Sequence, residues 1–340
     1  MNKSELERTA RSLVVKGKGI LAADESLRST ERRFARYHVE HIPENRRLYR
    51  DMMFTTPGLE EYISGVILFD ESIRQTAHDG SPFPEYLVKK GIIPGIKVDG
   101  GFVDLPGFPG EKITEGLDGL SARLAEYRGL GARFAKWRAV IAIGENIPSQ
   151  FCMQANAHAL ARYAACCQAA DIVPIVEPDV LIIGDHSIER CEEVSTEMLS
   201  TTFRELKKAN VYLEGTLLKP NMVLPGKDAP RQASNAEVAE ATLRTLKRTV
   251  PAAVPGVVFL SGGQGSVPAA ANLNAMVRMG GGPWELSFSY LRALADPAFD
   301  VWRGNSESFD AAQKVFYHRA RLTAAARKGE YQPSMEAMES

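Results

Sequence analysis

The stretch Glu214–Val223, EGTLLKPNMV, contains a short apolar run that ends at Lys219 and is followed at once by Pro220. A run of this kind is typical of a strand that is buried on both faces, as in a parallel sheet. At the end of such a strand, burial disfavours the ammonium form of Lys219, so that a neutral amine can attack a carbonyl. The competing interpretation is a solvated lysine at a strand edge, which is the commoner position for lysine.

Similar apolar runs occur at eight places along the chain, and most are followed by a segment with helical periodicity. Alternating strands and helices predict a (β/α)8 TIM barrel, because right-handed crossovers between parallel strands bring the sheet to closure. We expect one domain over residues 1–340, with a short N-terminal helix and a short tail from about residue 330. The alternative is a doubly wound open sheet, but no G-x-G-x-x-G turn follows the first strands and the sequence contains no P-loop. The predicted strands are Gly19–Asp24, Ile63–Phe69, Ile93–Asp99, Phe134–Val140, Ile172–Asp179, Gly215–Pro220, Val257–Ser261 and Glu285–Tyr290.

Local signals place several of the intervening elements. Ser234 and Glu237 form a capping-box pattern that predicts the start of a helix. The segment Ser4–Glu7 predicts a short helix ahead of the first strand. Residues 105–116 contain two prolines and three glycines and predict a surface excursion within the domain.

The composition of the chain argues against several classes of binding partner. The chain has 41 basic and 42 acidic side chains, so no overall field favours nucleic acid or an anionic membrane. No apolar stretch approaches the roughly 20 residues that span a bilayer, and the N-terminus lacks a secretory signal, which indicates the cytoplasm. The four cysteines and six histidines show neither disulfide nor metal-ligand spacing, so we expect no metal.

Charged side chains lie at the ends of most predicted strands, where the active sites of such barrels are built. Lys136 and Arg138 are two residues apart, as are Glu177 and Asp179, so each pair points to one face of its strand. A cationic Lys136 near Lys219 would lower the pKa of that amine. The alternative is a structural ion-pair network at the barrel mouth. The candidate catalytic residues are Lys219, Glu177, Asp24, Lys136, Arg138 and Asp179.

Two groups of residues predict separate anion sites. A Ser-Gly-Gly turn after the seventh strand exposes backbone N–H groups, and an arginine after the eighth adds a bidentate partner for phosphate. A second basic group follows the first strand, for which a solvated helix face is the competing interpretation. Two such sites beside an amine predict a substrate with a phosphate at each end. The first group is Ser261, Gly262, Gly263, Ser289 and Arg292, and the second is Ser26, Ser29, Arg32, Arg33 and Lys97.

Several longer motifs run in order along this pattern and resemble one known family. They are GKGILAADES from Gly17, LDGLS from Leu117, FAKWR from Phe134, PIVEP from Pro174, LEGTLLKPNMV from Leu213 and FLSGGQ from Phe259. Over nearly its whole length the chain resembles the class I fructose-1,6-bisphosphate aldolases, the metal-independent, Schiff-base type. The resemblance implies reversible cleavage of fructose 1,6-bisphosphate to dihydroxyacetone phosphate and glyceraldehyde 3-phosphate, with no cofactor.

The resemblance also implies a role for each candidate. The family's match to Lys219 forms the Schiff base, and its match to Glu177 moves protons during carbinolamine dehydration. The matches to Asp24, Lys136 and Arg138 support cleavage of the C3–C4 bond, with the aspartate facing the C4 hydroxyl. Family members hold the C1 phosphate with the residues that match Ser261, Gly262, Ser289 and Arg292, while Ser29, Arg32, Arg33 and Lys97 match residues near the other phosphate or at the mouth.

The sequence departs from the family pattern at three points. Asp179 stands where a glutamate is expected, and Leu291 stands where members have glycine next to the phosphate arginine. A backbone contact to phosphate at Leu291 would require a conformation that residues other than glycine tolerate. The sequence ends at Ser340 without the long tail, ending in tyrosine, of animal members.

Other functions stay open on sequence alone. Another Schiff-base aldolase, acting on sedoheptulose 1,7-bisphosphate or a monophosphate, would keep Lys219 and Glu177, and a non-catalytic sugar-phosphate-binding barrel would keep only the fold. The resemblance implies a homotetramer, although no interface stripe is evident in the sequence.

Overall fold

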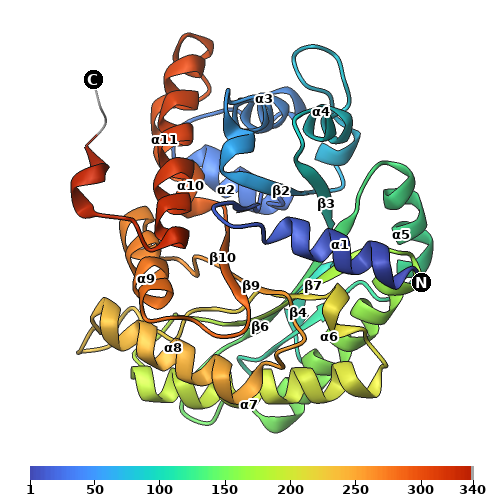
Figure 1. Ribbon diagram of the computed structural model, residues 1–340, viewed down its shortest axis with the longest axis vertical. Helices are drawn as coiled ribbons and strands as arrows, with labels where there is room; N and C mark the ends of the chain where they lie inside the picture. Colours follow the sequence, from blue (N-terminus) through green and yellow to red (C-terminus); the bar gives the residue numbers. More distant parts are fainter. Residues whose placement is uncertain (338–340) are drawn as a thin grey trace.

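Eight short parallel strands close into a barrel in the computed structural model, which describes residues 1–337 (Figure 1). The order around the barrel is β1-β10-β9-β8-β7-β6-β3-β2, and β1 pairs with both β10 and β2. The strands are β1 (Gly19–Leu21), β2 (Ile63–Leu68), β3 (Ile93–Lys97), β6 (Phe134–Ile141), β7 (Val173–Val180), β8 (Leu217–Leu218), β9 (Gly256–Phe259) and β10 (Glu285–Tyr290).

Each of the eight predicted runs overlaps one of these strands, so the predicted TIM barrel is confirmed and the open sheet is wrong. The sixth strand is shorter than predicted because Leu213–Gly215 forms a 3-10 turn and Pro220, which has no N–H, ends the ladder. Lys219 still donates its backbone N–H to Val176, so it stays in register with β7.

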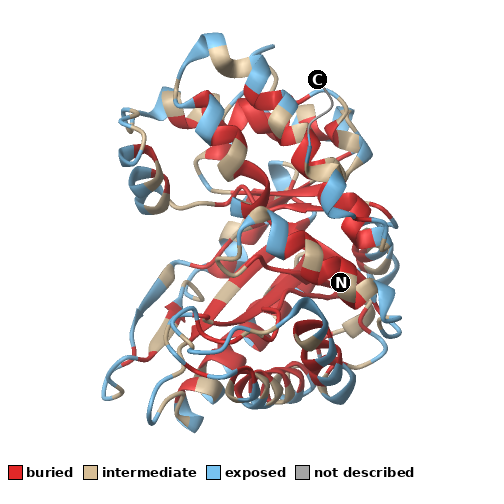
Figure 2. Cartoon of the chain, turned by 90° about the vertical axis from the view of Figure 1, so that its left-hand side faces the viewer, coloured by how far each residue is buried: buried red, intermediate tan, exposed pale blue. Residues whose placement is uncertain are grey.

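Helices surround the barrel, with their inner faces buried and their outer faces exposed (Figure 2). Ser234 and Glu237 form the predicted capping box at α8, while α1 begins one residue before Ser4, with Asn2 as its cap. The helices are α1 (Lys3–Leu13), α2 (Leu27–Ala35), α3 (Pro43–Phe54), α4 (Phe83–Lys89), α5 (Leu120–Gly129), α6 (Gln150–Ala169), α7 (Ile188–Lys208), α8 (Asn235–Thr249), α9 (Ser266–Arg278), α10 (Arg292–Trp302) and α11 (Phe309–Lys328). In residues 1–337, no helix combines the length and apolar character needed to cross a membrane.

The inner face of the barrel is apolar at its amino end. Side chains from β6, β7, β8 and β9 form one buried cluster with Leu6, Ala10 and Leu13 of α1 and with Val14, the residue that follows this helix. Helix α1 therefore closes this end of the barrel. Gly65 on β2 makes room for the helix, because a Cβ there would lie 2.6 Å from Leu13 Cδ2.

Two regions differ from expectation. Residues 105–116 are not only a surface excursion, because Lys112–Glu115 (β5) pairs antiparallel with Gly101–Asp104 (β4). Thr114 Oγ1 donates to the carbonyl of Arg138, which fixes this hairpin beside the end of β6. Within the predicted tail, Tyr331 is buried and Pro333–Glu336 forms a 3-10 turn, while residues 338–340 lie outside the described part of the chain.

Candidate active site

The barrel interior changes from apolar to charged toward the carboxyl ends of the strands. Phe134, Ile175 and Leu217 point into the inner cluster, and Lys136, Glu177 and Lys219 each follow one of them by two residues. Side chains two apart on a strand share a face, so these charged groups also point inward. All three side chains are buried, and Glu177 lies 3.3 Å from Lys136 Nζ and 3.5 Å from Lys219 Nζ, in agreement with this orientation.

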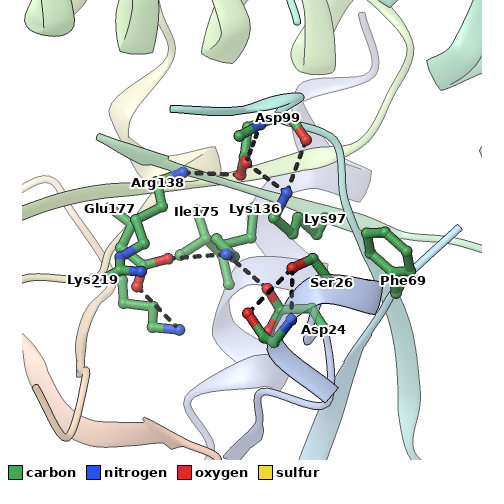
Figure 3. A network of polar contacts seen from close by, with 12 residues as sticks. Asp24, Ser26, Phe69, Lys97, Asp99, Lys136, Arg138, Ile175, Glu177 and Lys219 are labelled. Carbon is green, nitrogen blue, oxygen red and sulfur yellow. Dashed lines mark hydrogen bonds and ion pairs between the residues drawn. The ribbon is translucent and has the colours of Figure 1, made fainter. Parts of the chain in front are cut away.

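Lys219 is buried, not solvated at a strand edge. It is 3% exposed, and its Nζ lies 3.5 Å from Glu177 Oε1 (Figure 3). Burial lowers the pKa of Lys219, and the positive charge of Lys136 lowers it further, against the opposing carboxylates of Glu177 and Asp24. The neutral amine is therefore favoured relative to a lysine in water.

Lys136 lies between two carboxylates. Its Nζ is 2.7 Å from Asp24 Oδ2 and 3.3 Å from Glu177 Oε2. Asp24 follows β1 by three residues, on the other side of the barrel from β6. Burial disfavours its charge, but the carboxylates of Asp24, Glu177 and Asp99 outweigh burial and raise the pKa of Lys136. Although burial acts to raise it, the pKa of Asp24 is lowered by Lys136 and Lys219. Both partners of this pair are thus ionised near neutral pH.

Glu177 has a buried oxygen that accepts no hydrogen bond. Among the described residues its Oε2 has no hydrogen-bond partner, because the contact with Lys136 is an ion pair without hydrogen-bond geometry. A buried carboxylate oxygen without a hydrogen-bond partner is costly and is available to a substrate hydroxyl.

Asp179 pairs with Arg138 although its side chain is shorter than the expected glutamate. Its Oδ2 accepts from Nε and Nη2 of Arg138 at 2.8 and 2.6 Å. Asp179 is buried, whereas the Arg138 side chain is 37% exposed and reaches toward the mouth. The shorter carboxylate therefore still orients the arginine at the edge of the site.

Two further residues shape the site but were not among the candidates. Asp99 lies 2.5 Å from Lys97 Nζ and accepts from the backbone N–H of Arg138 at 3.2 Å. Asn221 accepts from Val180 N–H at 3.2 Å, which ties the end of β7 to the segment after Lys219. Asp99 could have been found from its place two residues after Lys97, whereas nothing in the pattern marks Asn221.

The Ser-Gly-Gly turn follows β9, and Ser289 lies at the end of β10, the strand that pairs with β9. Gly262 and Gly263 have φ values of +59° and +92°, the left-handed region that favours glycine. Ser289 is buried, and its Oγ has no hydrogen-bond partner within residues 1–337. The sequence did not reveal Lys227, whose Nζ would lie 3.3 Å from a Cβ placed on Gly263. Unpaired donors and a nearby ammonium suit this place to an anion.

Leu291 does not need the conformation of glycine. It precedes α10 with φ −117° and ψ −69°, and its side chain packs against the core. The first N–H groups of α10 have no intrahelical partner and can face an anion whether residue 291 is leucine or glycine. Arg292 is exposed at the start of the same helix.

The second predicted anion group is only partly assembled. Ser26 caps α2, and its Oγ lies 3.1 Å from Ser29 Oγ. Arg32 is exposed to solvent, as the competing interpretation expected, whereas Arg33 turns inward to Glu25 and Asp296. The charges of Arg33 and Lys97 are both already paired with carboxylates.

A family model described as "Glycolytic: Fructose-bisphosphate aldolase class-I" matches residues 5–340 of the chain. The chain belongs to the class I fructose-bisphosphate aldolase family. One similar protein, from Xanthomonas axonopodis pv. citri (strain 306), is named "Probable fructose-bisphosphate aldolase class 1" and is 54% identical over 97% of this chain and 99% of its own length. "Fructose-bisphosphate aldolase 5, cytosolic" of Arabidopsis thaliana is 50% identical over 96% of this chain and 91% of its own.

A solved fructose-bisphosphate aldolase is also similar in structure. The Plasmodium falciparum aldolase, in a complex with TRAP and a small-molecule inhibitor, matches with a TM-score of 0.95 and 47% identity, covering 97% of this chain and 95% of that one. The predicted family, aldehyde-lyase class and fold are thereby confirmed. Class I aldolases are metal-independent in general, and residues 1–337 hold no cluster of three or more His, Cys, Asp or Glu side chains suited to a metal.

Proposed function

We propose that this aldolase cleaves fructose 1,6-bisphosphate reversibly through a Schiff base on Lys219. The observation that carries the proposal is the buried amine of Lys219, 3.5 Å from Glu177 and with a lowered pKa. In this reaction the neutral amine attacks the C2 carbonyl and forms a carbinolamine. Glu177, 3.5 Å from Lys219 Nζ, takes the proton that this amine gives up on becoming neutral and then delivers it to the C2 hydroxyl, which leaves as water.

The resulting iminium is the electron sink for cleavage of the C3–C4 bond. Asp24, held ionised by Lys136, accepts the proton of the C4 hydroxyl, and the C3–C4 electron pair moves toward the iminium nitrogen to give an enamine. Lys136 stabilises the developing oxyanion. Glyceraldehyde 3-phosphate leaves, and protonation and hydrolysis of the enamine release dihydroxyacetone phosphate. No metal or other cofactor takes part in these steps.

Arg138 and Asp179 act as positioning residues at the edge of this centre. The C1 phosphate would be held by Ser261, Gly262, Gly263, Ser289 and Arg292, and the second phosphate would face Ser26, Ser29, Arg32, Arg33 and Lys97. The free Oγ of Ser289 and the open turn at Gly262 support the first assignment.

We also propose that the whole chain, residues 1–340, is a single domain that works in the cytoplasm as a homotetramer in glycolysis and gluconeogenesis. The family description "Glycolytic" and the cytosolic Arabidopsis relative support the setting, and the prevalence of closed symmetric assemblies supports an oligomer. Sedimentation at several concentrations would measure the assembly, and a monomer at all of them would contradict the tetramer.

A coupled assay for triose phosphates, run with a chelator, tests the function. We expect turnover of fructose 1,6-bisphosphate in the wild type and a loss of about 100-fold or more in Glu177→Gln, because general acid–base catalysis contributes on that order. Glu193→Gln, on the exposed surface of α7, is a control that should keep full activity. Cleavage of sedoheptulose 1,7-bisphosphate or fructose 1-phosphate without cleavage of fructose 1,6-bisphosphate would contradict the proposed substrate.

A further inference from the structure

The two predicted phosphate groups differ in how their cations are paired. In the described part of the chain, Arg292 and Lys227 take part in no ion pair, and Ser289 Oγ has no partner. At the other end, Arg33 and Lys97 each contact a carboxylate. A phosphate arriving at the first group meets free donors, whereas at the second group Arg33 and Lys97 are already paired and only Arg32, exposed on α2, is without an ion pair among the described residues.

Arg33 uses most of its hydrogen-bonding fork on carboxylates. Its Nε and Nη2 donate to Glu25 Oε1 at 3.1 and 3.0 Å, and Nη1 donates to Asp296. The guanidinium also lies over the rings of Tyr49 and Phe299, at 5.9 and 5.7 Å from their centroids. Three of the five N–H groups are therefore already in use, and displacing one of the carboxylates would free a further donor for a phosphate.

Asp296 is the carboxylate that can be displaced. Its side chain is 43% exposed, compared with 15% for Glu25, and it contacts a single nitrogen, whereas Glu25 contacts two. An exposed, single contact is worth less than a buried, double one. With Glu25 and Asp296 both ionised, their cluster with Arg33 carries a net charge of −1, which repels a phosphate.

We propose that Asp296 is a specificity-determining residue that competes with the distal phosphate of the substrate for Arg33. The inference rests on the proposed function, in which Arg33 faces the phosphate remote from the Ser-Gly-Gly turn. A bisphosphate that takes the place of Asp296 on Arg33 must break this ion pair, and the free energy lost with the pair offsets part of the new phosphate contact. A ketose 1-phosphate has no second phosphate and leaves the ion pair of Asp296 with Arg33 intact. Asp296 therefore makes the difference in affinity between bisphosphate and monophosphate smaller.

Steady-state kinetics of Asp296→Asn with fructose 1,6-bisphosphate and fructose 1-phosphate test this inference. Asparagine keeps the size of the side chain and removes its charge. We expect KM for the bisphosphate to fall about two- to fivefold, the range that an exposed ion pair supports, while KM for the monophosphate stays the same. Asp296→Ala should give the same pattern and provides a second route if the asparagine variant folds poorly.

Asp300→Asn is the matched control, since Asp300 lies one turn further along α10 and pairs with Tyr37 in place of Arg33. It should leave both KM values unchanged. In the double variant Arg33→Gln/Asp296→Asn, the gain for the bisphosphate should vanish.

Parallel changes in both KM values, or no change in either, would overturn the role of Asp296. A lower KM for the bisphosphate alone in Asp300→Asn would also overturn it, because the effect would then come from the net charge of α10. Failure of the proposed function is distinguishable, because the wild type would then not cleave fructose 1,6-bisphosphate.

Discussion

At the scale of single residues, burial is the main reason that Lys219 can act as a nucleophile. The sequence suggested Lys136 as the cation that lowers its pKa, and the structure places Lys136 among the causes. Burial is the larger cause, and the carboxylates of Glu177 and Asp24 act against it. Lys136 therefore offsets part of the effect of the two carboxylates, which favour the ammonium form of Lys219.

Replacing Lys136 by methionine tests this balance. Without its cation, Glu177 and Asp24 should raise the pKa of Lys219, because a nearby negative charge favours ammonium. Only the neutral amine attacks, so the rate of iminium formation falls as the pH drops through the pKa of Lys219. We therefore expect the pH profile of iminium formation with dihydroxyacetone phosphate to shift to higher pH in Lys136→Met.

The profile is measured by rapid reductive trapping, which follows iminium formation without carbon–carbon cleavage. Lys207→Met, an exposed lysine at the far end of α7, is the control and should keep the wild-type profile. An unshifted or acid-shifted profile in Lys136→Met would show that Lys136 does not set the pKa of Lys219.

At the scale of elements, the strands and their inward parity could be predicted because both depend on local patterns. Lys136 and Glu177 follow inward apolar residues by two, and this period is visible in the sequence. The pairing of Arg33 with Asp296 could not be predicted, because it depends on α2 and α10 packing together across 263 residues of chain. The β4–β5 hairpin was missed for a related reason, since its strands are short and mostly solvent-facing.

Leu291→Gly tests the start of α10. The backbone there already has a negative φ, so glycine should change KM for fructose 1,6-bisphosphate by less than about twofold. Loss of the packed side chain and the added freedom of glycine should lower the free energy of unfolding by about 1–3 kcal/mol. Denaturant titration and steady-state kinetics measure the two effects, and a large fall in KM with unchanged stability would mean that leucine obstructs the phosphate.

At the scale of the whole molecule, the residues that stabilise the barrel and the residues that we expect to act on the substrate lie at opposite ends of its axis. Helix α1 fills the amino end with apolar side chains, and the charged groups lie at the carboxyl end. The fully buried inner cluster between them holds the strands that carry Lys136, Glu177 and Lys219. The burial that lowers the pKa of Lys219 is thus a property of the closed barrel.

Leu13→Ala tests this separation. Leu13 is fully buried against the barrel, so its truncation should lower the free energy of unfolding by about 2–5 kcal/mol. KM should stay near the wild-type value, because α1 lies at the end opposite the charged groups. Val15→Ala, at a side chain that is 46% exposed, is the control for stability. A large change in KM at temperatures where Leu13→Ala is fully folded would contradict the separation.

Borohydride reduction in the presence of dihydroxyacetone phosphate, followed by peptide mass spectrometry, tests the central claim most directly. We predict one covalent adduct, on Lys219, and its loss together with aldolase activity in Lys219→Ala. An adduct on Lys136 instead, or cleavage of fructose 1,6-bisphosphate that survives in Lys219→Ala, would contradict the account.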